Sequence, residues 1–360
     1  MMALTFRGIS LERGLGRIDF GMALLAVPVL QGIGFCLEAF GWRGILASLG
    51  ARVSFRAVLR VRIVSEALSQ SIPLGVLFAE GSKPLLLRTR TGVAIPTGAA
   101  SVAARKYSLV VTQALLLAAI ALFGGPAIDR LGARLPGGPA TLRVIVAAGA
   151  IVLALSASAS RRALGGGAIA ERVRGLLARL PLVGSFAARH HEEFTEADVA
   201  AARYFRRSLG ERCRSAAPFL LAWCAESLET WFLLRLVGVD LGLGAAFCLE
   251  VPLGLLRSVA FFTPAGLGIQ DLGYATALAS LGVPDATAAA LGFVLLKRCK
   301  ETLWVAVGYA LLVSGRPARE PAECKFAQPS HSRGHREESE AHAVVHAHRS
   351  SVGSARPRPA

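Results

Sequence analysis

The stretch YSLVVTQALLLAAIALF, residues 107–123, contains no charged side chain. Its length approaches the roughly 20 residues that an α-helix needs to cross the apolar core of a bilayer. Hydrophobic residues fill 53% of the 360 positions and mean hydropathy is +0.51, which is too apolar for an ordinary soluble domain. The sequence therefore predicts an all-α, polytopic membrane helix bundle. Similar runs lie at residues 20–40, 141–159, 216–237, 244–262, 266–282 and 287–313, with a weaker one at 63–80.

The two ends of the chain differ from this apolar middle. The run at 20–40 lacks an Ala-x-Ala cleavage site, so we expect it to be an anchor rather than a cleaved signal peptide. Residues 314–360 are rich in Pro, Arg, Ser, Glu and His, which is typical of a disordered tail. We therefore expect a cytoplasmic N-terminal segment at 1–19, a transmembrane domain at 20–313 and a disordered cytoplasmic tail at 314–360.

The net charge of +16 lies largely in short loops beside the runs, which argues for membrane topology and against nucleic-acid binding. Eleven arginines between residues 161 and 215 place that loop in the cytoplasm by the positive-inside rule. Four spans follow, so the C-terminus is expected on the same side. If 63–80 crosses, there are eight spans and a cytoplasmic N-terminus. If it is re-entrant, there are seven.

Two apolar neighbourhoods carry the same interruption. SIPLGVLFAE (71–80) and TPAGLGIQD (263–271) each contain Pro-x-Gly with an acid seven positions after the proline. Transporter folds often contain two related halves, each with a Gly/Pro-interrupted segment near the bilayer midplane. An inverted repeat with two broken or re-entrant segments is one interpretation, and coincidence is the other. The residues concerned are Pro73, Gly75 and Glu80, then Pro264, Gly266 and Asp271.

Ionisable groups also occur inside the predicted spans, where they usually pair or line a substrate path. The segment KRCKE (297–301) has apolar residues on both sides, which places its charges near mid-depth. Glu66 and Gln70 give the 63–80 run a face unsuited to lipid. Structural ion pairs and a polar cavity both remain open. The other charges of the C-terminal half are Glu226, Glu229, Arg235, Glu250, Arg257 and Asp271.

Three stretches resemble the transmembrane-region proteins of lysylphosphatidylglycerol synthases, also described as flippase-like membrane proteins, with similarity to hopanoid-associated members. They are SIPLGVLFAEGSKPLLL (71–87), Arg105 in the following run, and FFTPAGLGIQDLGYATALASLGV (261–283) leading into VLLKR. The chain departs from that family at three positions. Lys83 replaces an arginine, Ala104 replaces an acid, and Asp271 replaces a glutamate.

The resemblance implies about eight helices, cytoplasmic termini, and translocation of lipid or support of lipid synthesis in a bacterial inner membrane. We expect a membrane lipid with an anionic headgroup as the ligand, and lipid-biosynthesis proteins as partners. Arg105, Arg257 and Lys297 are predicted to supply positive charge to one cavity between the two breaks. The candidate lipid-binding residues are Glu66, Gln70, Pro73, Gly75, Glu80, Lys83, Arg105, Glu226, Glu229, Arg257, Pro264, Gly266, Gly268, Asp271, Lys297 and Arg298.

Three functions compete at this point. The first is translocation of an anionic or polyprenyl-linked lipid. The second is an intramembrane enzyme that uses Glu226, Glu229 or Asp271 as acid or base. The third is a scaffold for a lipid-synthesis complex. The sequence has no Ser/His/Asp group, metal-ligand cluster or phosphate-binding loop, so we expect no enzyme activity, metal or cofactor. We also expect no soluble aminoacyltransferase domain in this chain.

Overall fold

The computed structural model describes residues 11–19, 21–72, 74–167, 169–179, 189–259 and 268–314. Every regular element within these ranges is a helix, and they contain no strand, so the all-α prediction is confirmed. The elements are α2 (Leu11–Leu15), the 3-10 helix η1 (Met22–Leu25), α3 (Ala26–Ser48), α4 (Phe55–Ser71), α5 (Gly75–Thr91), α6 (Ile95–Phe123), α7 (Gly125–Gly132), α8 (Pro139–Gly165), α9 (Ile169–Leu177), α11 (His191–Phe205), α12 (Leu209–Leu236), α13 (Leu243–Val259), α14 (Ile269–Ser280) and α15 (Ala286–Val313).

Two of the described helices, α6 and α8, are long and apolar enough to cross a membrane by length and composition alone. Helices α12 and α15 are as long, with 28 residues each, but charged side chains interrupt their apolar character. The predicted runs at 244–262 and 266–282 form α13 and α14, of 17 and 12 residues. At 1.5 Å per residue both are shorter than the roughly 30 Å hydrocarbon core. The number of spans stays a prediction.

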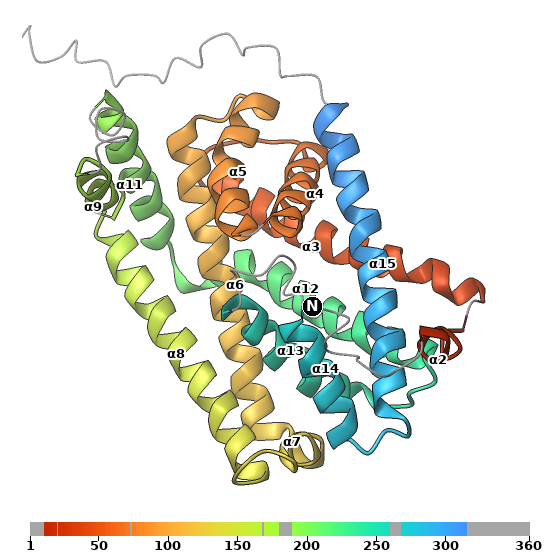
Figure 1. The fold of residues 1–360 in the computed structure, drawn as a ribbon. Coiled ribbons are helices and arrows are strands. Elements are labelled where there is room, and N and C mark those ends of the chain that lie inside the picture. Colours follow the sequence, from red (N-terminus) through yellow and green to blue (C-terminus); the bar gives the residue numbers. More distant parts are fainter. Residues whose placement is uncertain are drawn as a thin grey trace, which may run out of the picture. The chain divides into compact units, whose positions relative to one another are not determined.

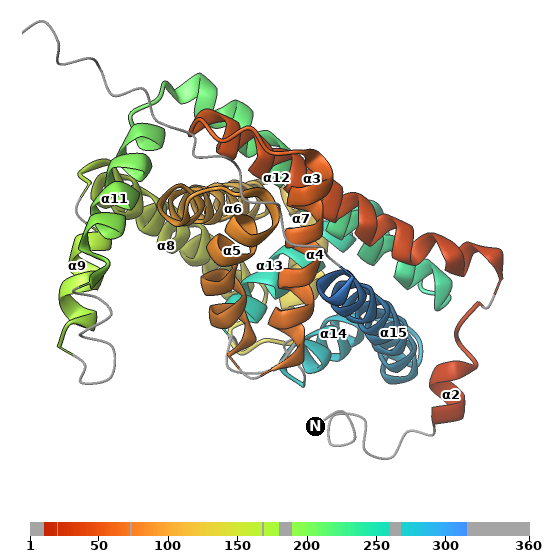
Figure 2. The same cartoon turned by 90° about the horizontal axis from the view of Figure 1, so that it is seen from above.

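Close packing between helices depends on small residues. In Figures 1 and 2, α3 and α12 lie side by side and cross the direction of α6 and α15. A Cβ atom at Gly41 of α3 would lie 2.8 Å from the Phe219 ring of α12. A Cβ atom at Gly308 of α15 would lie 2.5 Å from Cβ of Ala67 and 3.0 Å from the carbonyl oxygen of Ile63, both on α4. Small residues let membrane helices approach closely, and these glycines do so here.

The same order of helices occurs twice. A long helix (α3), two shorter helices (α4 and α5) and a second long helix (α6) pack in sequence, and α12, α13, α14 and α15 do the same. The α4–α5 pair lies between two long helices of its own half and also packs against α15 of the other. This repetition agrees with two related halves. Their inversion stays a prediction.

The first predicted break is present. Helix α4 ends at Ser71 and α5 begins at Gly75, and Leu74 between them has a positive φ of 57°. A Cβ atom at position 75 would lie 2.4 Å from the carbonyl oxygen of Ser69, which no side chain tolerates. The chain therefore turns back so tightly that only glycine fits. Pro73, and Pro264 and Gly266 of the second break, lie outside the described residues.

Candidate functional site

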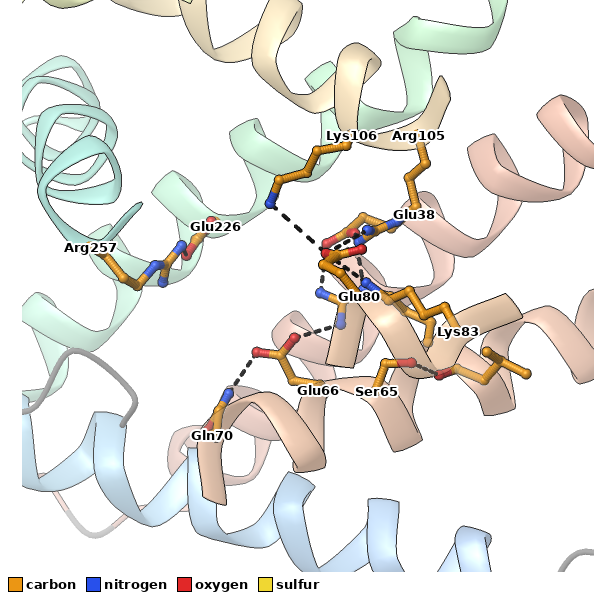
Figure 3. A network of polar contacts seen from close by, with 12 residues as sticks. Glu38, Ser65, Glu66, Gln70, Glu80, Lys83, Arg105, Lys106, Glu226 and Arg257 are labelled. Atoms are coloured by element: carbon orange, nitrogen blue, oxygen red, sulfur yellow. Dashed lines mark hydrogen bonds and ion pairs between the residues drawn. The ribbon is translucent and has the colours of Figure 1, made fainter. Parts of the chain in front are cut away.

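A buried network of charged side chains joins α3, α4, α5 and α6, and its centre is Glu38 (Figure 3). Arg62 of α4 donates from Nε and a terminal nitrogen to the two carboxylate oxygens of Glu38, each at 2.9 Å. Its other terminal nitrogen lies 2.5 Å from Glu66, and Glu66 also accepts from Gln70 at 2.7 Å. Bidentate pairs of this kind fix the orientation of both partners.

The network continues onto α5 and α6. Arg105 donates to Glu38 at 2.5 Å and approaches Glu80 at 3.5 Å. Lys83 contacts the same Glu80 oxygen at 2.7 Å, and Lys106 lies 3.9 Å from it. Glu38 and Glu80 therefore each hold two or more bases together. The first network is defined as Glu38, Arg62, Glu66, Gln70, Glu80, Lys83, Arg105 and Lys106.

This first network is open at one edge. The side chains of Glu66 and Glu80 are each 25% exposed and that of Lys106 is 54% exposed, whereas Lys83 and Arg105 are buried. With all groups ionised, its four bases and three acids give a formal charge of +1. Within the described part of the chain, Arg105 Nε and Glu80 Oε2 are buried and lack a hydrogen-bond partner. The site therefore retains a donor and an acceptor for a further polar group.

A second buried network joins α12, α13, α14 and α15 around Glu250. One carboxylate oxygen of Glu250 accepts from Thr230 at 2.7 Å and from the Tyr274 hydroxyl at 2.6 Å. The other oxygen lies 3.3 Å from Lys297 Nζ, which also donates to the Tyr274 hydroxyl at 2.5 Å. Gln270 donates to that hydroxyl at 3.2 Å. Four helices thus meet at one carboxylate with no exposed surface.

The second network has two further parts. Asp271 accepts the backbone N–H of Gly268 at 3.0 Å and an Arg298 nitrogen at 2.6 Å, and Arg298 also pairs with Glu301 at 2.6 Å. Lys300 pairs with Glu229 of α12. We define the second network as Glu229, Thr230, Glu250, Gln270, Asp271, Tyr274, Lys297, Arg298, Lys300 and Glu301. Its three bases and four acids give a formal charge of −1.

The pair between Glu226 of α12 and Arg257 of α13 is drawn apart from the first network in Figure 3. Its side chains approach to 2.9 Å, and each is about one third exposed, at 30% and 34%. Arg105 and Lys297, which the sequence placed around one cavity with Arg257, belong to different networks. Each of the three bases already has an acid partner.

The comparisons agree with this architecture. A model of the family described as lysylphosphatidylglycerol synthase TM region matches residues 2–297, which include the whole first network. The chain belongs to this family. It is a membrane protein of a family associated with lipids. No curated protein and no solved structure matches the chain.

Most of the residues predicted for lipid binding lie in or beside the two networks. Those in the first network are Glu66, Gln70, Glu80, Lys83 and Arg105, and those in the second are Glu229, Asp271, Lys297 and Arg298. Gly75 and Gly268 shape the helix starts beside them. Their role in binding lipid stays a prediction.

Sequence reasoning missed the central residue of the first network, and it named Glu250 of the second only as a charge inside a predicted span, not as a candidate lipid-binding residue. Glu38 is the only acid in the run at 20–40, and a single buried acid in a membrane span was a signal that could have found it. Arg62 lies four residues before Glu66, a spacing that predicts an ion pair on a helix. Tyr274 and Thr230 carry no such local signal, because their partner Glu250 lies on another helix.

Proposed function

We propose that this protein moves an anionic or polyprenyl-linked lipid between the leaflets of a bacterial cytoplasmic membrane. The first network receives the headgroup in this proposal. The observation that carries it is an apolar groove of about 700 Å³ beside that network. Phe35 of α3, Phe55, Leu59 and Ile63 of α4, and Trp304 of α15 contribute to its lining.

One aromatic ring separates the groove from the charges. The Phe35 ring lies edge-on to Trp304 at 5.0 Å between ring centres, and the Arg62 guanidinium carbon lies 4.9 Å from the Phe35 ring centre. A hydrocarbon chain in the groove would therefore lie one aromatic ring away from Arg62 of the first network. An apolar groove with a few convergent polar groups is typical of sites for amphipathic ligands.

The charge of the first network favours an anionic headgroup. Its formal charge is +1, and burial of an unpaired charge at this depth costs several kcal/mol. An anion that enters can take over a base from Glu80 while the carboxylate keeps a second base, since Lys83, Arg105 and Lys106 all face that acid. Because Glu80 keeps one base while the anion takes another, no charged group is left unpaired as the headgroup passes.

Lipid movement in proteoliposomes tests this proposal. Fluorescent phosphatidylglycerol is placed in the outer leaflet, and its transfer to the inner leaflet protects it from an impermeant quencher. We expect the wild-type chain to accelerate this transfer, and Glu80→Gln to slow it about tenfold, because the amide cannot hold the bases as a carboxylate does. Asp129→Asn is the matched control, since Asp129 pairs with Arg143 at an exposed position.

Two results would contradict the proposal. The first is transfer no faster than in liposomes without protein. The second is a Glu80→Gln rate equal to that of the wild type. Mass spectrometry of the lipid before and after the assay separates transport from chemistry: translocation leaves the mass unchanged, whereas a covalently altered lipid would favour the intramembrane enzyme.

The proposed orientation places residues 161–215 and the C-terminus in the cytoplasm. The eleven arginines of that loop support it through the positive-inside rule. Cys213, near the start of α12 and within residues 161–215, is an exposed free thiol and serves as a native reporter. A membrane-impermeant maleimide should leave Cys213 unlabelled in intact cells and label it after permeabilisation, with Cys213→Ser as the control. Labelling of Cys213 in intact cells would show that residues 161–215 face outward, opposite to the proposed orientation.

A further inference from the structure

A second pocket lies where α8 ends and α11 and α12 meet. Its lining residues are distant in sequence from those of the first network. Its volume is about 730 Å³ and its lining includes Arg203, Arg206 and Arg207. Gly166 and Gly167, which directly follow α8, also line the pocket and add no side chains to it. The pocket is therefore basic and open enough to admit a small anion.

The acids around the pocket are already engaged. Asp198 accepts the backbone N–H groups of Ala170 and Glu171 at 2.8 and 3.0 Å, so it caps the start of α9. Arg174 donates to Glu171 and holds the pKa of that carboxyl below its ordinary value. These contacts fix α9 against α11. Glu211 also lines the pocket and pairs with Arg207, so the three arginines and this one acid give the lining a formal charge of +2.

The three arginines differ in how they are held. Arg207 donates to the carbonyl oxygen of Ser48 at 2.7 Å and pairs with Glu211 at 3.3 Å. The side chains of Arg203 and Arg206 are exposed and have no ion-pair or hydrogen-bond partner within the described residues. One guanidinium is thus positioned and two remain available for an anion.

Apolar side chains accompany these charges. Val199 lines the pocket and is exposed, and Leu209, two residues after Arg207, is exposed as well. Val173 and Leu176 of α9 are also exposed. Apolar groups next to arginines are typical of surfaces that lie at the boundary between headgroups and acyl chains. A free phosphate compound would make no use of them.

We infer that the pocket of Arg203, Arg206 and Arg207 binds the phosphate of an anionic phospholipid in the membrane leaflet that it faces. This site is separate from the first network and does not depend on lipid translocation. Guanidinium groups suit it because they donate several hydrogen bonds to phosphate oxygens in a fixed planar geometry. The bound lipid would hold the α8–α11 segment at the membrane surface.

Native mass spectrometry of the full chain in mixed phosphatidylglycerol and phosphatidylcholine tests the inference. We expect the wild type to retain phosphatidylglycerol preferentially and Arg203→Ala/Arg206→Ala to bind it about 30-fold more weakly, or about fivefold per arginine. The control Arg52→Ala/Arg56→Ala removes the same charge from exposed positions next to and at the start of α4. It should weaken binding less than about twofold.

Comparison of the two double variants, a lysine variant and competition with inorganic phosphate complete the test. Equal losses in the two double variants would mean that overall charge attracts the lipid, and an unchanged Arg203→Ala/Arg206→Ala affinity would exclude the pocket; either overturns the inference. Arg203→Lys/Arg206→Lys should recover part of the binding, which shows that the alanine variant is not merely misfolded. Inorganic phosphate at matched concentration should not displace the lipid. Displacement would assign the pocket to a free phosphate compound instead.

Discussion

Each buried network joins four helices that pack in sequence, yet the two networks differ in charge and exposure. The first, on α3–α6, has a formal charge of +1 and an edge where Glu66 and Glu80 are each 25% exposed. The second, on α12–α15, has a formal charge of −1, and Glu250 at its centre has no exposed surface. Similar arrangements of helices therefore support one network with a partly exposed edge and one whose central carboxylate is fully buried.

The difference separates the charged side chains whose loss should destabilise the helix bundle from those that are exposed enough to contact a ligand. A buried ion pair adds little net stability, but loss of one partner is strongly destabilising because the other charge remains buried. Lys297 and Glu250 meet this condition. Lys106 does not, since more than half of its side chain is exposed.

Removal of Lys297 should give the largest effect. Lys297→Met leaves Glu250 without its base, and we expect a loss of about 3–5 kcal/mol in the free energy of unfolding. Denaturant titration in detergent, or loss of monodisperse protein on gel filtration, measures it. The double variant Lys297→Met/Glu250→Gln should recover much of the loss. If Lys297→Met alone were as stable as the wild type, the Lys297–Glu250 pair would not stabilise the bundle, and the contrast between the two networks would be wrong.

Replacement of Gly75 should give the next largest effect. In Gly75→Ala the new Cβ would lie 2.4 Å from the Ser69 carbonyl oxygen, so the break must open, at a cost of about 1–3 kcal/mol. Opening displaces Glu80 from its bases, and lipid transfer should fall with stability. Gly81→Ala is the matched control, because nothing lies within 4 Å of its Cβ. Equal stability and equal lipid transfer in the two variants would show that the turn between α4 and α5 can accommodate a side chain at position 75.

The smallest effect is expected at the exposed edge of the first network. Lys106→Met should change stability by less than about 1 kcal/mol, because the Lys106–Glu80 pair is long and its lysine exposed. It should slow transfer of phosphatidylglycerol a few-fold and leave phosphatidylcholine unaffected, and the difference should shrink at high salt. An equal effect on both lipids would remove the link between network charge and headgroup charge.

Local pattern was sufficient for much of the fold. Apolar runs predicted long helices because the bilayer imposes their length, and Pro73–Gly75 predicted the end of α4 because both residues disfavour a continuous helix. The matched acids were less informative. Asp271 lies in the first turn of α14 and accepts the Gly268 N–H, whereas Glu80 lies further into α5 and pairs with side chains. The same spacing thus serves two purposes.

The centres of both networks were beyond local pattern for a physical reason. Glu38 meets Arg105 across 67 residues, and Glu250 meets Lys297 across 47. Such pairs are created by the packing of helices, and no fixed spacing marks them. A buried charge in a span predicts that a partner exists. It does not say on which helix that partner lies.

The glycine at position 308 has a mechanical consequence. A Cβ atom at this position would lie 2.5 Å from the Ala67 methyl group and 3.0 Å from the Ile63 carbonyl oxygen, so only the Ala67 methyl group lies between the backbones of α4 and α15 there. Soft side chains elsewhere can absorb a small shift between helices, but here α4 cannot tilt without pushing on α15. Lys297 is eleven residues earlier on that helix, about 16 Å away along its axis. A larger residue at position 308 would therefore have to push α4 and α15 apart, on the same helix that carries Lys297 of the second network.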